Sequence, residues 1–396
     1  MVLVGVLSFW SLLGLIVVFD TGSRPMAASG PNPVNAAQRE ILTFERIISL
    51  PREVTGLAWS PDGKQVLVRM SWTGAFRLVD VESGVVGQPI TKILGHDGDF
   101  FYSPDGKYLV VPRTKSLRLF RFPNLELVGE LKGPRNTKEE EFCGFQVWFG
   151  AIFEPDGKSI WASCIVQGKG GTYLTAVKVS IPDLKIIDRL EVPPPVIGLR
   201  YMGASTNQQN RFERRGEEIY ILTRWRTSKG TFSTGYSLRT KKRLFPSIDM
   251  DELGFGEGWR GGNIAYSRNS SRLFVSRLQL EGSLYKRTTS RTTMKMLDAE
   301  TGKVVTNIPI TKKWGMAGVG PIVATKGGDL FVASVSYKAV DVDSPKRRGL
   351  AVFNVQSFEL LQQIETATTG TIYLSPDGHR LVIRRGRHLM VYRITE

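Results

Sequence analysis

The sequence predicts an all-β fold, a seven-bladed β-propeller of four-stranded blades, and three repeated signals support this prediction. A turn tetrapeptide recurs between apolar stretches, a glycine recurs at the start of one strand per unit, and an alternating strand followed by a turn ends each unit. A repeat of roughly 40 to 60 residues is typical of repeat architectures. Two sandwich domains, the other all-β possibility, would not explain that repeat.

The first signal is the turn Ser-Pro-Asp-Gly, found at 60–63, 103–106 and 375–378 and, with glutamate for serine, at 154–157. Proline presets the first central residue of the turn, aspartate caps it, and glycine takes the left-handed position. The flanking apolar stretches predict a hairpin at each copy. Hairpins without this turn are expected at 264–275 and 322–332, and at 199–222, where a long polar insert follows the inner strand at 199–201.

The second and third signals give the same count of seven. Glycines stand where the inner strands are expected to start, at 56, 98, 150, 198, 262, 320 and 370. Inner strands converge near the axis of a propeller, where a residue without Cβ relieves crowding. Alternating third strands are expected in every unit, for example at 76–81, 117–122, 175–181 and 293–299.

The last unit ends one strand short of four, after residues 389–393. The stretch 42–48 precedes the first inner strand and has the composition of a strand. We expect this N-terminal strand to complete the last blade, because closure removes the open edge of an unfinished sheet. The propeller is therefore predicted to span residues 41–396.

The N-terminal segment is predicted to be one hydrophobic helix. Residues 1–19 contain no charged side chain, and an apolar run of that length is long enough to cross a bilayer. Residues 1–20 are expected to form a transmembrane anchor or a signal segment, followed by a flexible linker over 21–40. The segment lacks the basic start of a signal peptide, and sidedness and cleavage stay open. We expect a membrane-anchored or exported protein, periplasmic or extracellular; a start at Met26 would instead leave a cytoplasmic one.

The Ser-Pro-Asp-Gly-Lys turns at 60–64 and 103–107 resemble those of bacterial WD-repeat-like propellers. That superfamily includes the Tyr-Val-Thr-Asn-type, quinoprotein-like and lactonase-like propellers. The resemblance covers about residues 41–396 and implies architecture alone, because these folds host binding platforms as well as unrelated enzymes. No Trp-Asp dipeptide occurs, and a Gly-His-Asp stretch that resembles the Gly-His element occurs once, at 95–97.

No catalytic centre is indicated by the sequence. The expected mouth of the central channel carries the polar residues Thr55, Asp99, Asn263 and Thr371, too few acids for a metal cage. Nucleophile-elbow, P-loop and dinucleotide motifs are missing, and we expect no metal and no cofactor. Cys143 and Cys164 fit no zinc spacing; they form one disulfide or stay two free thiols.

The charge predicts where a partner binds. The net charge is +16 and the pI about 9.8, which favours anionic partners, although plain solubility is an alternative explanation. Basic residues gather in the loops between second and third strands, which share one face of a propeller. This basic loop face is predicted to include Arg113, Lys115, Arg226, Lys229, Lys286, Arg287, Arg347, Arg348, Arg384 and Arg385.

These observations favour a non-catalytic interaction platform, exported or membrane-tethered, that binds a protein or an anionic surface through the basic loop face. Nucleic acid is not favoured, because aromatic side chains do not alternate with the basic loops as stacking platforms require. The alternative is a propeller enzyme, lactonase-like or quinoprotein-like, with its site at the channel mouth. Three or more convergent His, Asp or Glu side chains there would indicate the enzyme.

Overall fold

The computed structural model describes residues 40–71, 75–90, 100–113, 116–132, 142–145, 151–168, 171–193, 211–215, 218–227, 230–249, 263–266, 272–281, 288–298, 300–309, 316–325, 329–337, 348–366 and 370–395. Within these ranges the chain forms strands and turns and no α-helix. No helix in them has the length and apolar character needed to cross a membrane. The expected N-terminal helix and nearly all of the linker, residues 1–39, lie outside the described residues.

Hydrogen bonding groups the described strands into seven antiparallel sheets. The first sheet comprises β2 (Val54–Trp59), β3 (Gln65–Met70) and β4 (Phe76–Asp80). The second comprises β5 (Phe101–Tyr102), β6 (Tyr108–Arg113), β7 (Ser116–Arg121) and β8 (Glu126–Lys132). The third comprises β10 (Ala151–Phe153), β11 (Ser159–Gly168), β12 (Gly171–Ser180) and β13 (Ile186–Val192), and β9 (Phe142–Phe145) pairs with β11. The next two comprise β14 (Arg211–Arg215), β15 (Glu218–Thr227), β16 (Gly230–Ser237) and β17 (Arg243–Asp249); then β18 (Asn263–Tyr266), β19 (Arg272–Glu281), β20 (Thr288–Asp298) and β21 (Val304–Pro309).

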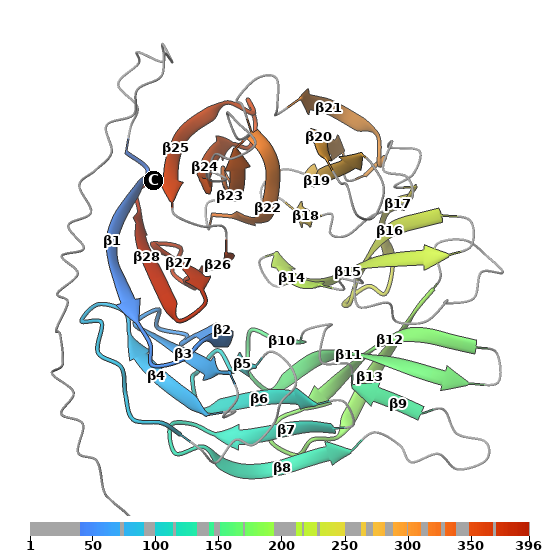
Figure 1. Cartoon of the computed structure of the whole chain (residues 1–396). Coiled ribbons are helices and arrows are strands. Elements are labelled where there is room, and N and C mark those ends of the chain that lie inside the picture. The colour runs from blue at the N-terminus through green and yellow to red at the C-terminus, as the bar shows by residue number, and fades with distance from the viewer. Residues whose placement is uncertain are drawn as a thin grey trace, which may run out of the picture. The chain divides into compact units, whose positions relative to one another are not determined.

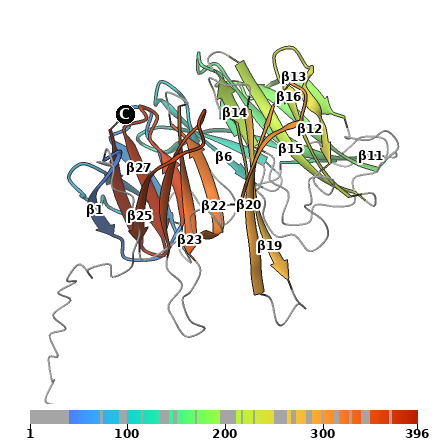
Figure 2. The same ribbon diagram turned by 90° about the horizontal axis from the view of Figure 1, so that it is seen from above.

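The last two sheets complete the order. One comprises β22 (Met316–Ala324), β23 (Leu330–Tyr337), β24 (Arg348–Asn354) and β25 (Leu360–Thr366). The other, here called the closing sheet, comprises β26 (Thr371–Leu374), β27 (Arg380–Arg385), β28 (His388–Ile394) and β1 (Leu42–Ser49). Figure 2 shows the longest hairpin, β19–β20, whose register runs from Arg272 opposite Asp298 to Glu281 opposite Thr288.

Among the described residues, buried apolar clusters join six pairs of neighbouring sheets. Three of them join β2–β4 to β5–β8, β5–β8 to β10–β13, and β10–β13 to β14–β17. Three more join β18–β21 to β22–β25, that sheet to the closing sheet, and the closing sheet to β2–β4. Sheets β14–β17 and β18–β21 also meet, since a Cβ on Gly302 would lie 3.7 Å from Cγ1 of Ile248. The sheets are therefore arranged as in a β-propeller, in chain order (Figure 1).

The repeated turn explains the hairpins. The Ser60 hydroxyl donates to Oδ1 of Asp62 over 2.5 Å, and the same oxygen accepts the Lys64 N–H over 3.1 Å. Gly63 has a φ of +70°, which a residue without Cβ adopts freely. The turns at 103–106 and 375–378 have the same serine–aspartate bond. The predicted turn chemistry is confirmed in these three copies.

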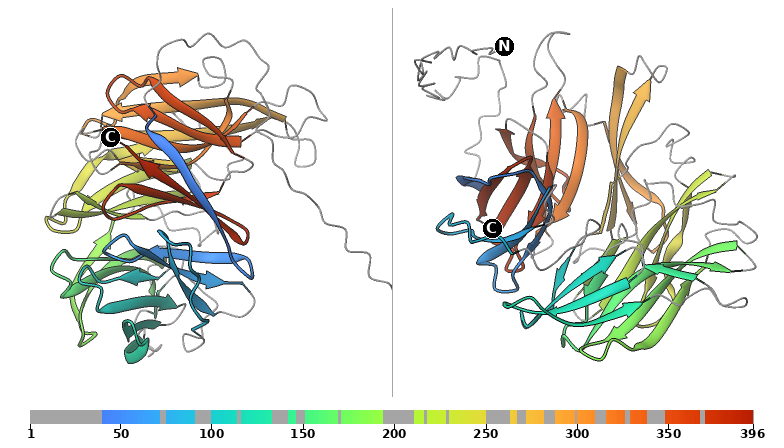
Figure 3. Two further views of the ribbon diagram at one scale, coloured as in Figure 1. Left: turned by 90° about the vertical axis from the view of Figure 1, so that its left-hand side faces the viewer. Right: turned by 60° about the horizontal axis from the view of Figure 1, so that its bottom comes forward.

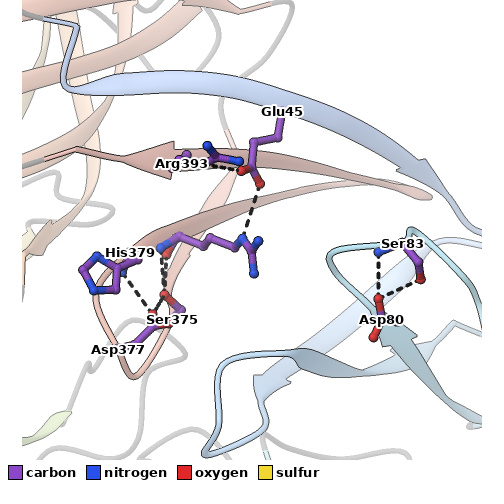
Figure 4. Close-up of polar contacts among 8 residues, drawn as sticks. Glu45, Asp80, Ser83, Ser375, Asp377, His379 and Arg393 are labelled. Carbon is purple, nitrogen blue, oxygen red and sulfur yellow. Dashed lines mark hydrogen bonds and ion pairs between the residues drawn. The ribbon is translucent and has the colours of Figure 1, made fainter.

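The N-terminal strand completes the last sheet, as predicted. β1 pairs antiparallel with β28 from Leu42 opposite Ile394 to Ser49 opposite His388, and Figure 3 shows the blue strand along the dark red ones. Glu45 accepts Arg393 Nε over 2.7 Å and lies 3.4 Å from Arg380 Nε (Figure 4). Glu45 thus links β1 to both β27 and β28.

A side chain of the neighbouring sheet also holds β1. The Gln362 carbonyl oxygen accepts the N–H groups of Ile41 and Leu42 over 2.9 and 2.6 Å. The Gln362 amide donates back to the Leu42 carbonyl over 2.9 Å. Because Gln362 belongs to β25 and is 9% exposed, these bonds connect two sheets inside the packed region.

The prediction of four strands per sheet is wrong for two of the seven sheets. Among the described residues, sheet β2–β4 has three strands, and isolated bridges at Val86 and Ile90 stand in place of a fourth. Gly87 and Pro89 interrupt that stretch; glycine weakens a strand, and proline cannot donate to the ladder. Sheet β10–β13 has the additional strand β9, which the sequence pattern did not predict.

The sequence pattern did not predict β14 (Arg211–Arg215) or β9 (Phe142–Phe145). β15 pairs with β14, which lies inside the expected polar insert, whereas the expected inner strand at 199–201 lies outside the described residues. β14 has a single apolar residue, Phe212, and this residue is buried. In β9 and β11, Cys143 lies opposite Val166 and Cys164 opposite Phe145. Their pairing stays a prediction.

Candidate functional site

The predicted basic loop face is described in part. The side chains of Arg113, Arg348 and Arg384 are half-buried and that of Arg385 is exposed. All four lie beside a loop between the second and third strands of a sheet. Arg226 lies near the end of β15, where its backbone is described. The remaining members are outside the described residues: Lys115, Lys229, Lys286, Arg287 and Arg347.

Backbone hydrogen bonds bring part of this face together. The turn between β27 and β28 lies against the connection from β1 to β2, because Leu50 N donates to the Arg387 carbonyl and Val54 N donates to the Gly386 carbonyl, both over 2.8 Å. The end of β3 joins the same connection, where Ser71 N donates to the Glu53 carbonyl over 2.7 Å. Three separate segments therefore meet around residues 50–54.

Five arginines lie on these segments, and we call them the arginine cluster: Arg52, Arg69, Arg384, Arg385 and Arg387. Arg52, Arg385 and Arg387 are exposed. Among the described residues, none of these three has an ion pair with a carboxylate. The backbone contacts thus hold three exposed guanidinium groups on adjoining segments.

Two of the predicted channel-mouth residues, Thr55 and Thr371, are hydrogen-bonded to members of the arginine cluster. Arg69 Nε donates to Oγ1 of Thr55 over 3.0 Å, and Arg384 Nη2 donates to Oγ1 of Thr371 over 3.5 Å. Asn263 begins β18 opposite Ser276, and Asp99 lies outside the described residues. Within the described part of the chain, no three His, Cys, Asp or Glu side chains gather as a metal site would require.

A comparison with protein families finds no family model that matches the chain. A search of the curated proteins finds no match either. The site must therefore be interpreted from its own residues.

The opposite ends of the hairpins carry carboxylates. The Ser60 hydrogen bond holds the pKa of Asp62 below its ordinary value of 3.8. At Asp377, burial raises the pKa, but the hydrogen bonds from Ser375 and from the His379 N–H outweigh it and the pKa is lowered (Figure 4). These aspartates are structural caps of turns, which leaves the basic end of the sheets as the candidate interface.

Sequence reasoning placed Arg384 and Arg385 but missed Arg52 and Arg69. The signal for Arg69 was present, since it follows Ser60 by nine residues, as Arg384 follows Ser375. Nothing in the sequence indicated Arg52, because its place in the cluster depends on the backbone bonds of Leu50 and Val54 to a turn more than 300 residues away.

Proposed function

We propose that this chain is a non-catalytic interaction platform, a propeller of seven blades that binds an anionic partner through the arginine cluster. Two observations support the count of seven. The described strands form seven sheets that follow one another in chain order, and apolar clusters at six junctions, with the contact of Gly302 and Ile248 at the seventh, link neighbouring sheets. The turn motif supports kinship in architecture with WD-repeat-like propellers.

The arginine cluster is the observation that carries the proposal. Guanidinium groups bind carboxylates and phosphates in a bidentate manner. Several exposed on adjoining segments attract an anionic surface over about a Debye length, roughly 8–10 Å at physiological ionic strength. Arg113, Arg226 and Arg348 lie at or near the corresponding ends of strands β6, β15 and β24 in three other sheets. The partner is a protein or an anionic membrane surface.

The same proposal includes localisation. A hydrophobic segment at residues 1–20 would tether the propeller to a membrane or direct its export. A tethered propeller would meet anionic lipid headgroups at high local concentration, and each basic residue near such a surface contributes about 1 kcal/mol.

The test uses residues 40–396, so that the apolar N-terminus cannot insert into lipid by itself. Sedimentation with vesicles of neutral lipid, and of neutral lipid with a fifth of anionic lipid, measures charge-dependent binding. We expect binding to the anionic vesicles, lost when Arg52, Arg385 and Arg387 are changed to glutamate. The matched control changes Lys64, Lys107 and Lys158, exposed at the opposite ends of the hairpins, to glutamate and keeps binding.

If both triple variants lose vesicle binding equally, the net charge of the protein explains the binding, and this result would contradict the role of the arginine cluster. If no vesicle binds, capture of a protein by the unchanged chain and not by the arginine variant identifies a protein partner. Failure of both assays rejects the platform.

A further inference from the structure

Sheet β10–β13 departs from the repeat at three positions that touch one another. In four other sheets the hairpin turn begins with Ser60, Ser103, Thr325 or Ser375. In each, the N–H of that residue bonds the carbonyl five residues later, which fixes the alignment. The residues seven positions after the turn start and their cross-strand partners are all aliphatic: Leu67 with Leu78, Val110 with Leu119, Val332 with Val352 and Val382 with Val391.

The equivalent residues of sheet β10–β13 are Glu154, Trp161 and Lys178. Glu154 also bonds the carbonyl five residues later, and Trp161 pairs with Lys178 across the strands. Oε1 of Glu154 accepts Trp161 Nε1 over 2.9 Å and lies 2.7 Å from Lys178 Nζ. The ammonium also lies 5.8 Å from the centre of the Trp161 ring. Trp161 is 2% exposed and packs in the apolar cluster shared with sheet β14–β17. A partly exposed ion pair contributes little to stability, so packing does not explain the Glu154–Lys178 pair.

These three side chains line a pocket between sheets β10–β13 and β14–β17. The pocket has a volume of about 560 Å³, and its other lining residues are Pro155, Asp156, Asp188, Ile219, Leu238 and Arg239. Small-molecule sites commonly have volumes of about 300–1,000 Å³ and lie between packed units. Elsewhere successive turns touch: a Cβ on Gly106 would lie 3.8 Å from Pro61, and one on Gly157 would lie 3.6 Å from Pro104. The turn at 154–157 is the last in this series of touching turns, and the pocket lies on its side facing sheet β14–β17.

The lining carries both signs of charge. The wall formed by β10–β13 presents the carboxylates of Glu154, Asp156 and Asp188 together with the Lys178 ammonium, and the opposite wall presents the exposed Arg239. A ligand of a single strong charge meets repulsion from one group or the other. A hydroxyl group both donates and accepts, so a molecule rich in hydroxyls satisfies carboxylates and cations together.

We propose that this pocket binds a neutral, polyhydroxylated small molecule of the saccharide class. The carboxylate of Asp156 accepts its hydroxyl protons, and so does Oδ2 of Asp188, whose Oδ1 already accepts Lys241 Nζ and the Arg189 N–H. Arg239 donates to its oxygens. Glu154 and Trp161 hold Lys178 at the wall, so that its remaining N–H bonds face the ligand.

The test is calorimetric titration of the full chain, purified without sugar-headgroup detergents, with glucose, galactose, maltose, sucrose and trehalose. A parallel set contains neutral zwitterions, namely glycine and diglycine. We expect saturable binding of at least one saccharide and of neither zwitterion. Arg239→Ala should weaken that binding about tenfold or more, the usual effect of losing a charged hydrogen bond, whereas Lys242→Ala, exposed nearby and outside the lining, should not change it.

A triple variant returns the pocket to the repeat: Glu154→Ser, Trp161→Leu and Lys178→Leu. We expect it to lose saccharide binding and, because Trp161 is 2% exposed, to unfold at a lower denaturant concentration. Arg239→Ala changes an exposed position and therefore tests binding without this loss of stability. Undiminished binding by this variant or by Arg239→Ala overturns the proposal. Binding of the zwitterions alone, or of neither set, overturns it as well.

Discussion

The serine of each hairpin turn acts on a carboxylate two residues away. The Ser60 hydroxyl, the largest influence on Asp62, lowers the pKa of that carboxyl below 3.8. A carboxyl with a lower pKa in the folded state stabilises the fold above the unfolded-state pKa. That contribution disappears as the pH falls through the lower folded-state value.

Ser60→Ala should therefore raise the pKa of Asp62 toward 3.8, and loss of the bond to Asp62 should reduce stability above pH 4 by about 0.5–1.5 kcal/mol. Loss of the two bonds between Ser60 and Gln65 adds a destabilisation that does not depend on the Asp62 charge. The difference between variant and unchanged protein should shrink as the pH falls below the Asp62 pKa. Denaturant unfolding at pH 7 and at pH 3 measures it. A difference that is equal at both pH values would contradict this coupling.

Among the described glycines, Gly370 has the closest contacts to an added Cβ. A Cβ there would lie 2.2 Å from the carbonyl oxygen of Arg384, a backbone atom, and 2.8 Å from Cγ2 of Ile383. Gly370→Ala should destabilise the protein by at least about 1–3 kcal/mol, because the strand itself must shift. At Gly56 the nearest atom is a ring carbon of Phe100 at 3.0 Å, so Gly56→Ala should cost less. Equal unfolding midpoints for the two variants would contradict this order.

At the residue scale, local chemistry was predictable and long-range placement was not. The turn bonds of Ser60 and Asp62 follow from four consecutive residues, and the crowding at Gly56 and Gly370 follows from repetition. The unusual turn at 154–157 was visible in the sequence as one glutamate among serines. The contact of this glutamate with Lys178 could not be predicted, because Lys178 lies opposite Trp161 only through the strand register.

At the scale of elements, β1 depends on one amide of another sheet. Gln362→Leu would leave the N–H groups of Ile41 and Leu42 and the Leu42 carbonyl without this partner. Each buried group left unpaired costs about 1–3 kcal/mol, so we expect a loss of several kcal/mol and faster amide exchange over residues 41–48. Gln363→Leu, at the exposed neighbouring position, is the matched control. Unchanged exchange in β1 would show that β28 alone holds the strand.

Strands with regular alternation were predicted well, and irregular or polar strands were not. β4 and β7 fall within one residue of the expected ranges 76–81 and 117–122. β14 was missed because four of its five residues are polar, and burial of Phe212 alone fixes its role. β9 is four residues long and pairs at the edge of β11, which gives a sequence pattern too short to read.

For the whole molecule, closure by β1 decides whether the last sheet has an open edge. A chain starting at residue 50 should lose this strand, expose the edge of β28 and self-associate, because unpaired strand edges recruit other chains. A chain starting at residue 40 should stay monomeric and unfold in one transition. Sedimentation velocity and denaturant unfolding of both chains test this. A monomeric, equally stable shorter chain would show that β28 is protected by other means.

The bond between Glu45 and Arg393 joins residues 348 positions apart. At synthesis rates of about 5–20 residues per second, roughly 15 to 70 seconds pass between the emergence of β1 and that of its partner. During this interval β1 has no strand to pair with, and its apolar residues are open to other nascent chains or to chaperones. The closing sheet can thus form only after β28 has emerged, when the first described strand joins the last.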